Sequence, residues 1–181
     1  MADSRPAVFL DRDGVINRSI VRDGLPYAPD TVDELEILPG VAEALARLKV
    51  AGFRLVVTTN QPDVARGLQR RDVVEQINAT LTVALPLDEF RVCYHDDRDG
   101  CDCRKPQPGL LLAAARESGL DVAASFMVGD RWRDIEAGRR AGCRVIFVDH
   151  GYAERRPDNP DYTASSLSEA ADWILAETGR A

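Results

Sequence analysis

The sequence predicts an α/β fold with a doubly wound parallel sheet. Three observations predict it: short, continuous apolar runs recur along the chain, apolar residues with helical spacing separate them, and polar residues follow the runs directly. Strands that alternate with helices form right-handed βαβ units. With 181 residues, 45% of them hydrophobic, the chain suits one Rossmann-like domain spanning 1–181 with a sizeable core.

Five apolar runs are the expected strands. They carry little alternation of polar and apolar residues, which is typical of strands buried on both faces of a parallel sheet. Their positions are residues 8–10, 53–59, 90–94, 124–128 and 145–148.

Helical patterns occupy the segments between these runs. Val41, Ala44, Leu45 and Leu48 follow one helix face, and residues 70–83 repeat that spacing. Further helices are expected from Pro108 to near Gly119, over 134–141 before Gly142, and after a capping box formed by Ser166 and Glu169. The Pro- and Asp-rich segment 151–165 is expected to cross the surface to the last helix.

Charge and composition exclude several classes of partner. The formal net charge is −7 and the pI is about 4.9, so a nucleic acid or an anionic membrane is not an expected partner. The first apolar run is too short for a signal peptide, and no stretch has transmembrane length. We therefore expect a cytoplasmic protein, in which the four cysteines are thiols or metal ligands.

The first strand ends in two acids, Asp11 and Asp13, followed by Gly14. Ligands of open α/β sheets bind at the carboxyl ends of strands, where two carboxylates can hold a divalent cation and one can attack an electrophile. A strand followed by an ordinary polar turn is the alternative interpretation of this segment alone.

The other strand ends also carry polar clusters. The second strand ends in Thr59, Asn60 and Gln61, and the third leads through a Cys/His segment to Arg104 and Lys105. The fourth leads to Asp130 and, four residues later, Asp134. Because parallel strands end at one edge of a sheet, these clusters are expected to converge there.

In this order and spacing the clusters resemble the four motifs of the haloacid dehalogenase superfamily of phosphotransferases. The matching segments are DxDGxxN from Asp11, the Thr of TTNQ, RKP, and GDxxxD from Gly129. The resemblance covers nearly the whole chain. It implies that Asp11 is the nucleophile that forms an aspartyl-phosphate, and that Asp13 protonates the leaving oxygen and then activates water.

The same resemblance implies a Mg²⁺ ion between Asp11, Asp130 and the backbone carbonyl of Asp13. Thr59 and the Asn60 N–H would donate to phosphate, although a strand-end Thr also caps turns. Lys105, one of two lysines among 23 basic residues, would supply positive charge.

Two further polar residues of the fourth cluster keep alternative interpretations. Asp134 either orients Lys105 or metal-bound water, or is a plain acid at a helix N-terminus. Arg131 is expected to be a solvated helix charge rather than a substrate contact.

Three of the four cysteines and a histidine fall within one short segment: Cys93, His95, Cys101 and Cys103. Three thiolates and an imidazole complete a tetrahedral Zn²⁺ site without an open position, so this zinc would be structural. The alternative is a CxC redox pair with an uninvolved histidine. Cys143 is expected to be a small buried side chain, and His150 a loop residue.

The zinc loop beside RKP, with TNQPDVARG at 59–67, narrows the resemblance to the heptose 1,7-bisphosphate phosphatases, whose zinc loop the histidinol-phosphate phosphatases share. By this resemblance Arg104 contacts the sugar or its distal phosphate, and Asn60, Gln61 and Pro62 line the pocket. The chain departs from the pattern in the long loop at 18–34 and in Asp63, where those enzymes have a small residue.

The spacing of the motifs leaves no room for a cap domain, so specificity is expected from the 18–34, 61–67 and zinc loops. We expect a monomeric, Mg²⁺-dependent phosphatase of a sugar bisphosphate. Histidinol-phosphate or a sugar monophosphate is the alternative substrate, and a DNA 3′-phosphatase is disfavoured by the acidic charge. A catalytically inactive, zinc-stabilised binding module is the alternative from another class.

Overall fold

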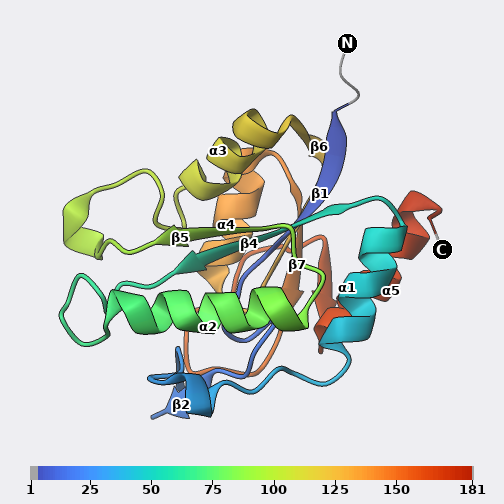
Figure 1. Cartoon of the computed structure of the whole chain (residues 1–181). Helices are drawn as coiled ribbons and strands as arrows, with labels where there is room; N and C mark the ends of the chain where they lie inside the picture. Colours follow the sequence, from blue (N-terminus) through green and yellow to red (C-terminus); the bar gives the residue numbers. More distant parts are fainter. Residues whose placement is uncertain (1–3, 181) are drawn as a thin grey trace.

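The computed structural model describes residues 4–180, which form a sheet with helices on both faces (Figure 1). The six-stranded sheet has the order β5-β4-β1-β6-β7-β8, and every pair in it is parallel. Its strands are β1 (Arg5–Leu10), β4 (Arg54–Asn60), β5 (Glu89–Cys93), β6 (Leu120–Gly129), β7 (Arg144–Val148) and β8 (Tyr162–Ala164). The doubly wound parallel sheet predicted from the sequence is confirmed.

Five helices connect or follow these strands in the described part of the chain. They are α1 (Val41–Val50), α2 (Arg71–Ala84), α3 (Gly109–Ser118), α4 (Trp132–Ala141) and α5 (Leu167–Thr178). Each lies where the apolar spacing predicted a helix. None of the described helices has the length and apolar character needed to cross a membrane.

The helices form two layers because alternate residues of each strand face opposite sides of the sheet. Val8 and Leu10 of β1 pack in a cluster with α1, α2 and α5, whereas Ala7 and Phe9 pack in a second cluster with α3 and α4. Figure 1 shows these two groups of helices on opposite sides of the strands. Both faces of the strands are therefore buried, which explains their nearly continuous apolar runs.

Strand β1 lies at the point where the strand order reverses. The chain runs outward from β1 through β4 to β5, then returns to the other side of β1 with β6. Leu10, the last residue of β1, pairs with Val57 of β4 and Val128 of β6. Ligands of such sheets bind beyond the carboxyl ends of the strands at this switch point, where Asp11 follows Leu10.

The 18–34 loop, expected to be a loop without strands, contains a hairpin. Strands β2 (Ile20–Arg22) and β3 (Leu25–Tyr27) pair antiparallel, and a short helix, η1 (Val32–Glu34), follows. Asp23 and Gly24 connect the strands with φ values of 52° and 77°. An Asp-Gly pair with two positive φ angles is a typical two-residue hairpin turn, so the signal was present in the sequence.

Two other local predictions need correction. The segment 151–165 does not only cross the surface, because Tyr162–Ala164 adds the edge strand β8 beside β7. The capping box before α5 forms only in part: the Ser166 hydroxyl accepts from the Glu169 N–H, but the Glu169 carboxylate accepts from Ser165 instead of Ser166. Three-residue strands and reciprocal caps depend on neighbouring segments, which local patterns do not specify.

Candidate active site and zinc cluster

The polar strand ends meet around one cavity of about 260 Å³ at the carboxyl edge of the sheet. Its walls come from the ends of β1, β4 and β6, from the β2–β3 hairpin and from the loops after β4 and β5. The residues that line it include Asp11, Asp13, Ser19, Tyr27, Asn60, Gln61, Pro62, Asp63, Arg66, Asp97, Arg104, Lys105, Asp130, Arg131, Arg133 and Asp134. The predicted convergence of the four clusters therefore occurs.

Asp11 is buried at the centre of this site. One carboxylate oxygen accepts from the Arg12 backbone N–H at 2.8 Å and lies 3.0 Å from Lys105 Nζ. Burial, and then the charge of Asp134, raises the pKa of Asp11 to about 7, against the lowering effect of Lys105. A cation would oppose this increase and favour the ionised carboxylate that a nucleophile requires.

Lys105 is 1% exposed and lies between two acids, Asp11 and Asp134. Nζ is 2.7 Å from Asp134 and donates to the Thr58 carbonyl at 2.6 Å. Burial lowers the pKa of Lys105, but the charges of the two acids outweigh burial and raise it, so the side chain is a cation. Asn60 fixes its backbone, because the amide donates to the Lys105 carbonyl and accepts from the Lys105 N–H, each at 3.0 Å.

Asp134 fits both interpretations that the sequence left open, because it contacts Lys105 and also lies at the N-terminus of a helix. One oxygen contacts Lys105, and the other accepts from the Arg131 N–H at 3.0 Å at the beginning of α4. Arg131, expected to be a solvated helix charge, has a partly exposed side chain and is paired with an acid. It lines the cavity and donates to the Glu154 carboxylate through two nitrogens, at 2.7 and 2.6 Å.

Asp130 has the environment of a cation ligand. Both carboxylate oxygens are buried without a well-formed hydrogen bond within residues 4–180, although the nearby Tyr152 hydroxyl opposes the increase of the Asp130 pKa. Burial, with the charges of Asp11 and Asp134, raises the pKa of Asp130 well above its ordinary value. An unpaired buried carboxylate is costly, and a hard divalent cation would compensate its charge.

Oxygens of Asp11, Asp130 and Asp134 lie within 4.8 Å of one another and are candidate donors to such a cation. The donor set therefore fits Mg²⁺. The side chain of Asp13 lies outside this group, and the use of its backbone carbonyl as a ligand stays a prediction. Asp134 adds a third carboxylate that the predicted ligand set did not contain.

The Asp13 carboxylate is held by side chains from three parts of the chain. Arg12 donates to both oxygens at 3.1 Å, Asn17 donates at 3.0 Å and Gln61 at 2.8 Å. The same Gln61 nitrogen donates to the Thr59 hydroxyl at 2.9 Å. Thr59 itself is buried behind the lining residues, so its contact with phosphate stays a prediction.

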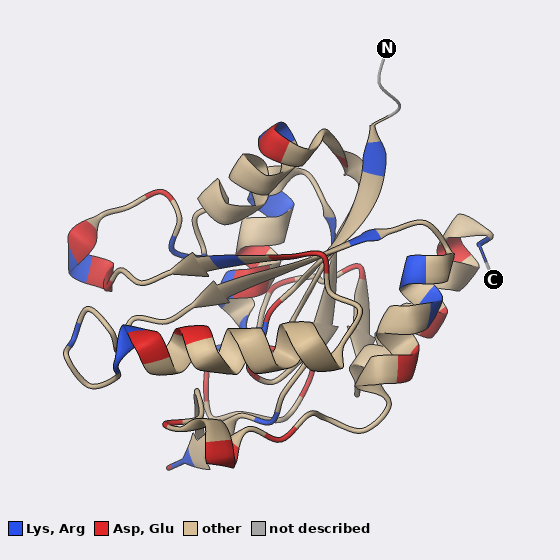
Figure 2. Ribbon diagram, in the orientation of Figure 1, with Lys and Arg blue, Asp and Glu red and all other residues tan. Residues whose placement is uncertain are grey.

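Three arginines surround Asp97 at the mouth of the cavity. Arg104 Nε donates to Asp97 at 2.8 Å, Arg133 Nη1 donates to the same oxygen at 3.3 Å, and Arg66 Nη2 lies 4.0 Å from the other oxygen. Arg104 Nη1 is buried and has no partner in the described structure. Figure 2 shows acidic and basic residues next to each other on the η2 turn (Asp97–Asp99), on the left. This cluster offers donors to a second anionic group.

The predicted zinc ligands converge beside the cavity. Ligand atoms of Cys93, His95, Cys101 and Cys103 all lie within 4.8 Å of one another. Sulfur–sulfur distances are 3.0, 3.4 and 3.7 Å, and His95 Nδ1 lies 3.3 Å from Cys103 Sγ. Burial raises the pKa of the Cys101 thiol, but hydrogen bonds from Cys103 and backbone groups outweigh it and lower the value to about 7.

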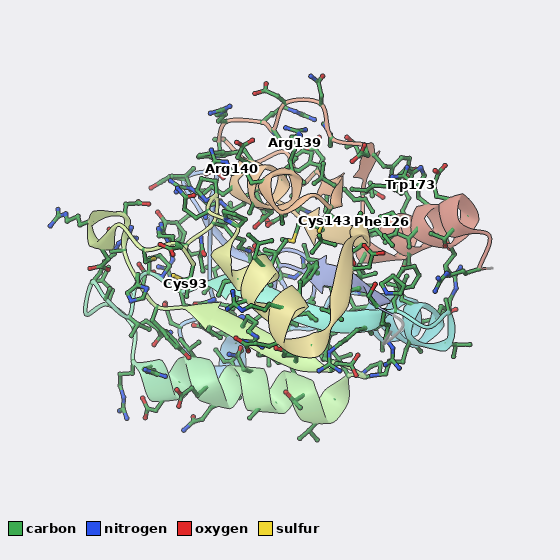
Figure 3. All side chains as sticks on the ribbon, turned by 90° about the horizontal axis from the view of Figure 1, so that it is seen from above. Cys93, Phe126, Arg139, Arg140, Cys143 and Trp173 are labelled. Atoms are coloured by element: carbon green, nitrogen blue, oxygen red, sulfur yellow. The ribbon has the colours of Figure 1, made fainter. Side chains whose placement is uncertain are left out.

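A tetrahedral zinc site needs four such donors at similar separations, so the set fits Zn²⁺. The three thiols are free rather than paired in a disulfide. Cys143 is buried and takes no part in the cluster, as expected, and Figure 3 shows it well separated from Cys93.

Several residues that shape the site were missed in the sequence. Arg12 and Asn78 support Asp13, and His150 is more than a loop residue, because Nε2 lies 2.6 Å from the Gly14 carbonyl. The placement of Arg12 between the two motif acids was a local signal. Asn78, a polar residue on the apolar face of α2, was a second one.

Comparisons with known proteins agree with this geometry. A family model described as HAD-hydrolase-like matches residues 102–170. The D-glycero-β-D-manno-heptose-1,7-bisphosphate 7-phosphatase of Escherichia coli (strain K12) is 39% identical over 188 residues, which cover 97% of this chain and 91% of the relative. The chain belongs to the haloacid dehalogenase superfamily of phosphatases.

Other relatives of this phosphatase have similar names. The D-glycero-D-manno-heptose-1,7-bisphosphate 7-phosphatase of Thermosynechococcus vestitus is 35% identical over 94% of this chain and 95% of its own. The crystal structure of a D,D-heptose 1,7-bisphosphate phosphatase from B. bronchiseptica, complexed with magnesium and phosphate, has a TM-score of 0.78 and 32% identity. The match covers 95% of this chain and 99% of the B. bronchiseptica chain. The resemblance and enzyme class predicted from the sequence are confirmed.

Proposed function

We propose that this phosphatase hydrolyses a sugar bisphosphate, of the heptose 1,7-bisphosphate class, through a phosphorylated Asp11. The observation that carries the proposal is the arrangement of the cavity. Asp11, Lys105 and the carboxylates of Asp130 and Asp134 lie at the carboxyl edge of the sheet. The arginines around Asp97 lie at the mouth of the cavity. The names of the relatives support the same substrate class.

In the first step an Asp11 oxygen attacks phosphorus, and the bond from phosphorus to the sugar oxygen breaks. Asp13 gives its proton to the departing oxygen. In the second step Asp13 takes a proton from water, whose oxygen attacks phosphorus and releases Asp11 and inorganic phosphate. One carboxyl thus serves as acid and then as base. Lys105, whose Nζ lies 3.0 Å from one Asp11 oxygen, holds the Asp11 carboxylate in place for the attack.

Asp11, Asp130 and the Asp13 carbonyl would hold Mg²⁺, with Asp134 close by, and the ion would neutralise phosphoryl charge that otherwise repels Asp11. The magnesium and phosphate in the related B. bronchiseptica structure support this assignment. Zn²⁺ on Cys93, His95, Cys101 and Cys103 would fix the loop that carries Arg104 and Lys105.

Substrate selection is assigned to the loops, because the described chain has no cap domain between the motif segments. The hairpin contributes Leu25 and Tyr27 to the cavity, the loop after β4 contributes Pro62 and Asp63, and the zinc loop contributes Arg104. Arg104 would contact the distal phosphate or the sugar, because its Nη1 is buried without a partner. The cytoplasmic location and monomeric state remain predictions.

The experiment is a phosphate-release screen over sugar mono- and bisphosphates with Mg²⁺, repeated with Asp11→Asn. We expect the greatest kcat/KM for a heptose 1,7-bisphosphate and no turnover by the variant. Histidinol-phosphate or a sugar monophosphate is the second candidate, because the histidinol-phosphate phosphatases share the zinc loop. A higher kcat/KM for either monophosphate would replace the proposal, and turnover by Asp11→Asn would refute the nucleophile assignment.

A further inference from the structure

Arg12 is the largest fully buried side chain among residues 4–180, with 0% exposure. It directly follows Asp11, the proposed nucleophile, and precedes Asp13, the proposed proton carrier. An arginine is rarely buried unless its charge and its donors are all compensated. The contacts of Arg12 therefore indicate what the side chain is for.

All of these contacts but one are made to Asp13. Nε donates to one carboxylate oxygen and Nη2 to the other, both at 3.1 Å. This two-bond arrangement fixes the plane of the carboxylate as well as its position, which a single point charge does not achieve. Asp13 still lines the cavity, and its side chain is 15% exposed.

The remaining contact anchors the guanidinium from the opposite side. Arg12 Nη1 donates to Asn78 Oδ1 at 2.9 Å. Asn78 lies on the buried face of α2, whose other buried residues are Val74, Ile77 and Leu81. Asn78 is the polar member of this buried set, and its bond to Arg12 compensates the burial of its amide oxygen.

Asp13 has two more donors, Asn17 and Gln61. Two carboxylate oxygens accept about four hydrogen bonds, so these donors and the two from Arg12 occupy all positions. A substrate oxygen that exchanges a proton with Asp13 must displace one donor. Gln61 lies on the cavity wall, whereas Arg12 lies behind the carboxylate, so the exchange takes place on the Gln61 side.

We propose that Arg12, anchored by Asn78, is a positioning residue that keeps the Asp13 carboxylate aimed at the leaving oxygen while Gln61 gives way. The inference rests on the proposed function, because it takes Asp13 as the proton carrier. Arg12 itself transfers no proton and does not touch the substrate.

The test compares leaving groups in the first turnover. p-Nitrophenolate departs without a proton, whereas an alkyl or sugar alkoxide needs one. Arg12→Lys keeps the positive charge but loses the two-bond geometry. Its rate of first-turnover p-nitrophenolate release should stay within about threefold of the wild type, and its first-turnover cleavage of an alkyl phosphate should fall by about 10- to 100-fold at unchanged KM.

Asn78→Leu is the second variant, because it leaves Arg12 in place and suits the apolar face of α2. Its first-turnover cleavage of the alkyl phosphate should fall by about three- to tenfold, a smaller loss than in Arg12→Lys, and its p-nitrophenolate release should change little. If both variants lose the two reactions equally, or lose neither, Arg12 has only a structural role and the inference is wrong. If Arg12→Lys does not fold, Asn78→Leu alone decides between these outcomes.

Asp13→Asn separates this inference from the proposed function. It should retain the p-nitrophenolate burst, lose cleavage of the alkyl phosphate, and accumulate phosphoenzyme. An Asp13→Asn variant without leaving-group dependence would refute the role of Asp13 itself, whatever the Arg12 variants do.

Discussion

Gly14 and Asp130 occupy adjoining space so closely that a Cβ at Gly14 would lie 1.8 Å from Asp130 Oδ2. Gly14 also has a φ of +85°, which other residues rarely adopt. Gly14 is thus required because Asp130, more than a hundred residues later in the chain, fills the space that a side chain would need.

Gly14→Ala should therefore displace Asp130 and lower kcat/KM by at least about 100-fold, the size expected when a metal ligand is moved. Calorimetric titration with Mg²⁺ should show weaker binding. Gly119→Ala is the matched control, because Gly119 also has a positive φ, +62°, but no atoms close to the added Cβ. It should cost about 1 kcal/mol of stability and leave activity unchanged. Equal activity loss in both variants would contradict the argument.

The two lysines offer a second matched pair. Lys105→Met should lower the free energy of unfolding by about 3–5 kcal/mol, because it leaves Asp11 and Asp134 buried without their cation. Lys49→Met removes an exposed ion pair with Asp88 and should cost about 1 kcal/mol or less. Urea unfolding in buffer without Mg²⁺ measures both. A Lys105 variant as stable as the Lys49 variant would show that the buried charges are compensated in another way.

The effect of Mg²⁺ on stability should increase with pH. Burial raises the pKa of Asp11 to about 7 and that of Asp130 well above its ordinary value, so both hold protons in the metal-free folded chain where the unfolded chain has lost them. Without Mg²⁺, the free energy of unfolding should therefore fall as pH rises from about 4 to about 7.

Mg²⁺ replaces these protons, so it should raise the Tm more at pH 8 than at pH 5. Thermal unfolding with and without the ion measures this difference. Asp130→Asn should remove most of it. A Mg²⁺ effect that is the same at both pH values would contradict the prediction.

Zinc binding should depend on the cluster of Cys93, His95, Cys101 and Cys103, and not on the number of cysteines in the chain. Elemental analysis is expected to find about one zinc per chain in the wild type and in Cys143→Ser, and almost none in Cys101→Ser. The Tm of the Cys101 variant should fall by at least about 5 °C, because metal binding contributes directly to folding. Zinc-free wild-type protein would favour the redox alternative.

Arg104 should discriminate bisphosphates from monophosphates. Arg104→Ala should raise KM for a sugar bisphosphate by about 10- to 100-fold and change KM for the monophosphate little, because a charged hydrogen bond is worth about 1.5–3 kcal/mol. Arg98→Ala, an exposed residue of the same loop, is the control. Equal KM increases for both substrates would place Arg104 at the reacting phosphate instead.

Much of the site could be predicted because a parallel sheet imposes geometry on local sequence. All strand ends of one direction meet at one edge, so acids directly after β1 and β6 converge whatever the loops do. The Cys/His spacing similarly confined four ligands to the end of β5 and the loop after it. Asn60 shows the limit: it lines the cavity as expected, but its amide holds the Lys105 backbone, a pairing across 45 residues.

By itself, the sequence determined the strand and helix pattern, the order of the motifs, and which acids and thiols would be neighbours, because these follow from local periodicity and strand direction. Only the tertiary structure decided which side chains pair with them: Asn78 with Arg12, His150 with Gly14, and Asp97 with three arginines. Such contacts join distant segments, and they depend on where α2 and the loops pack and on the direction of each side chain. These are collective properties of the folded chain that no local pattern contains.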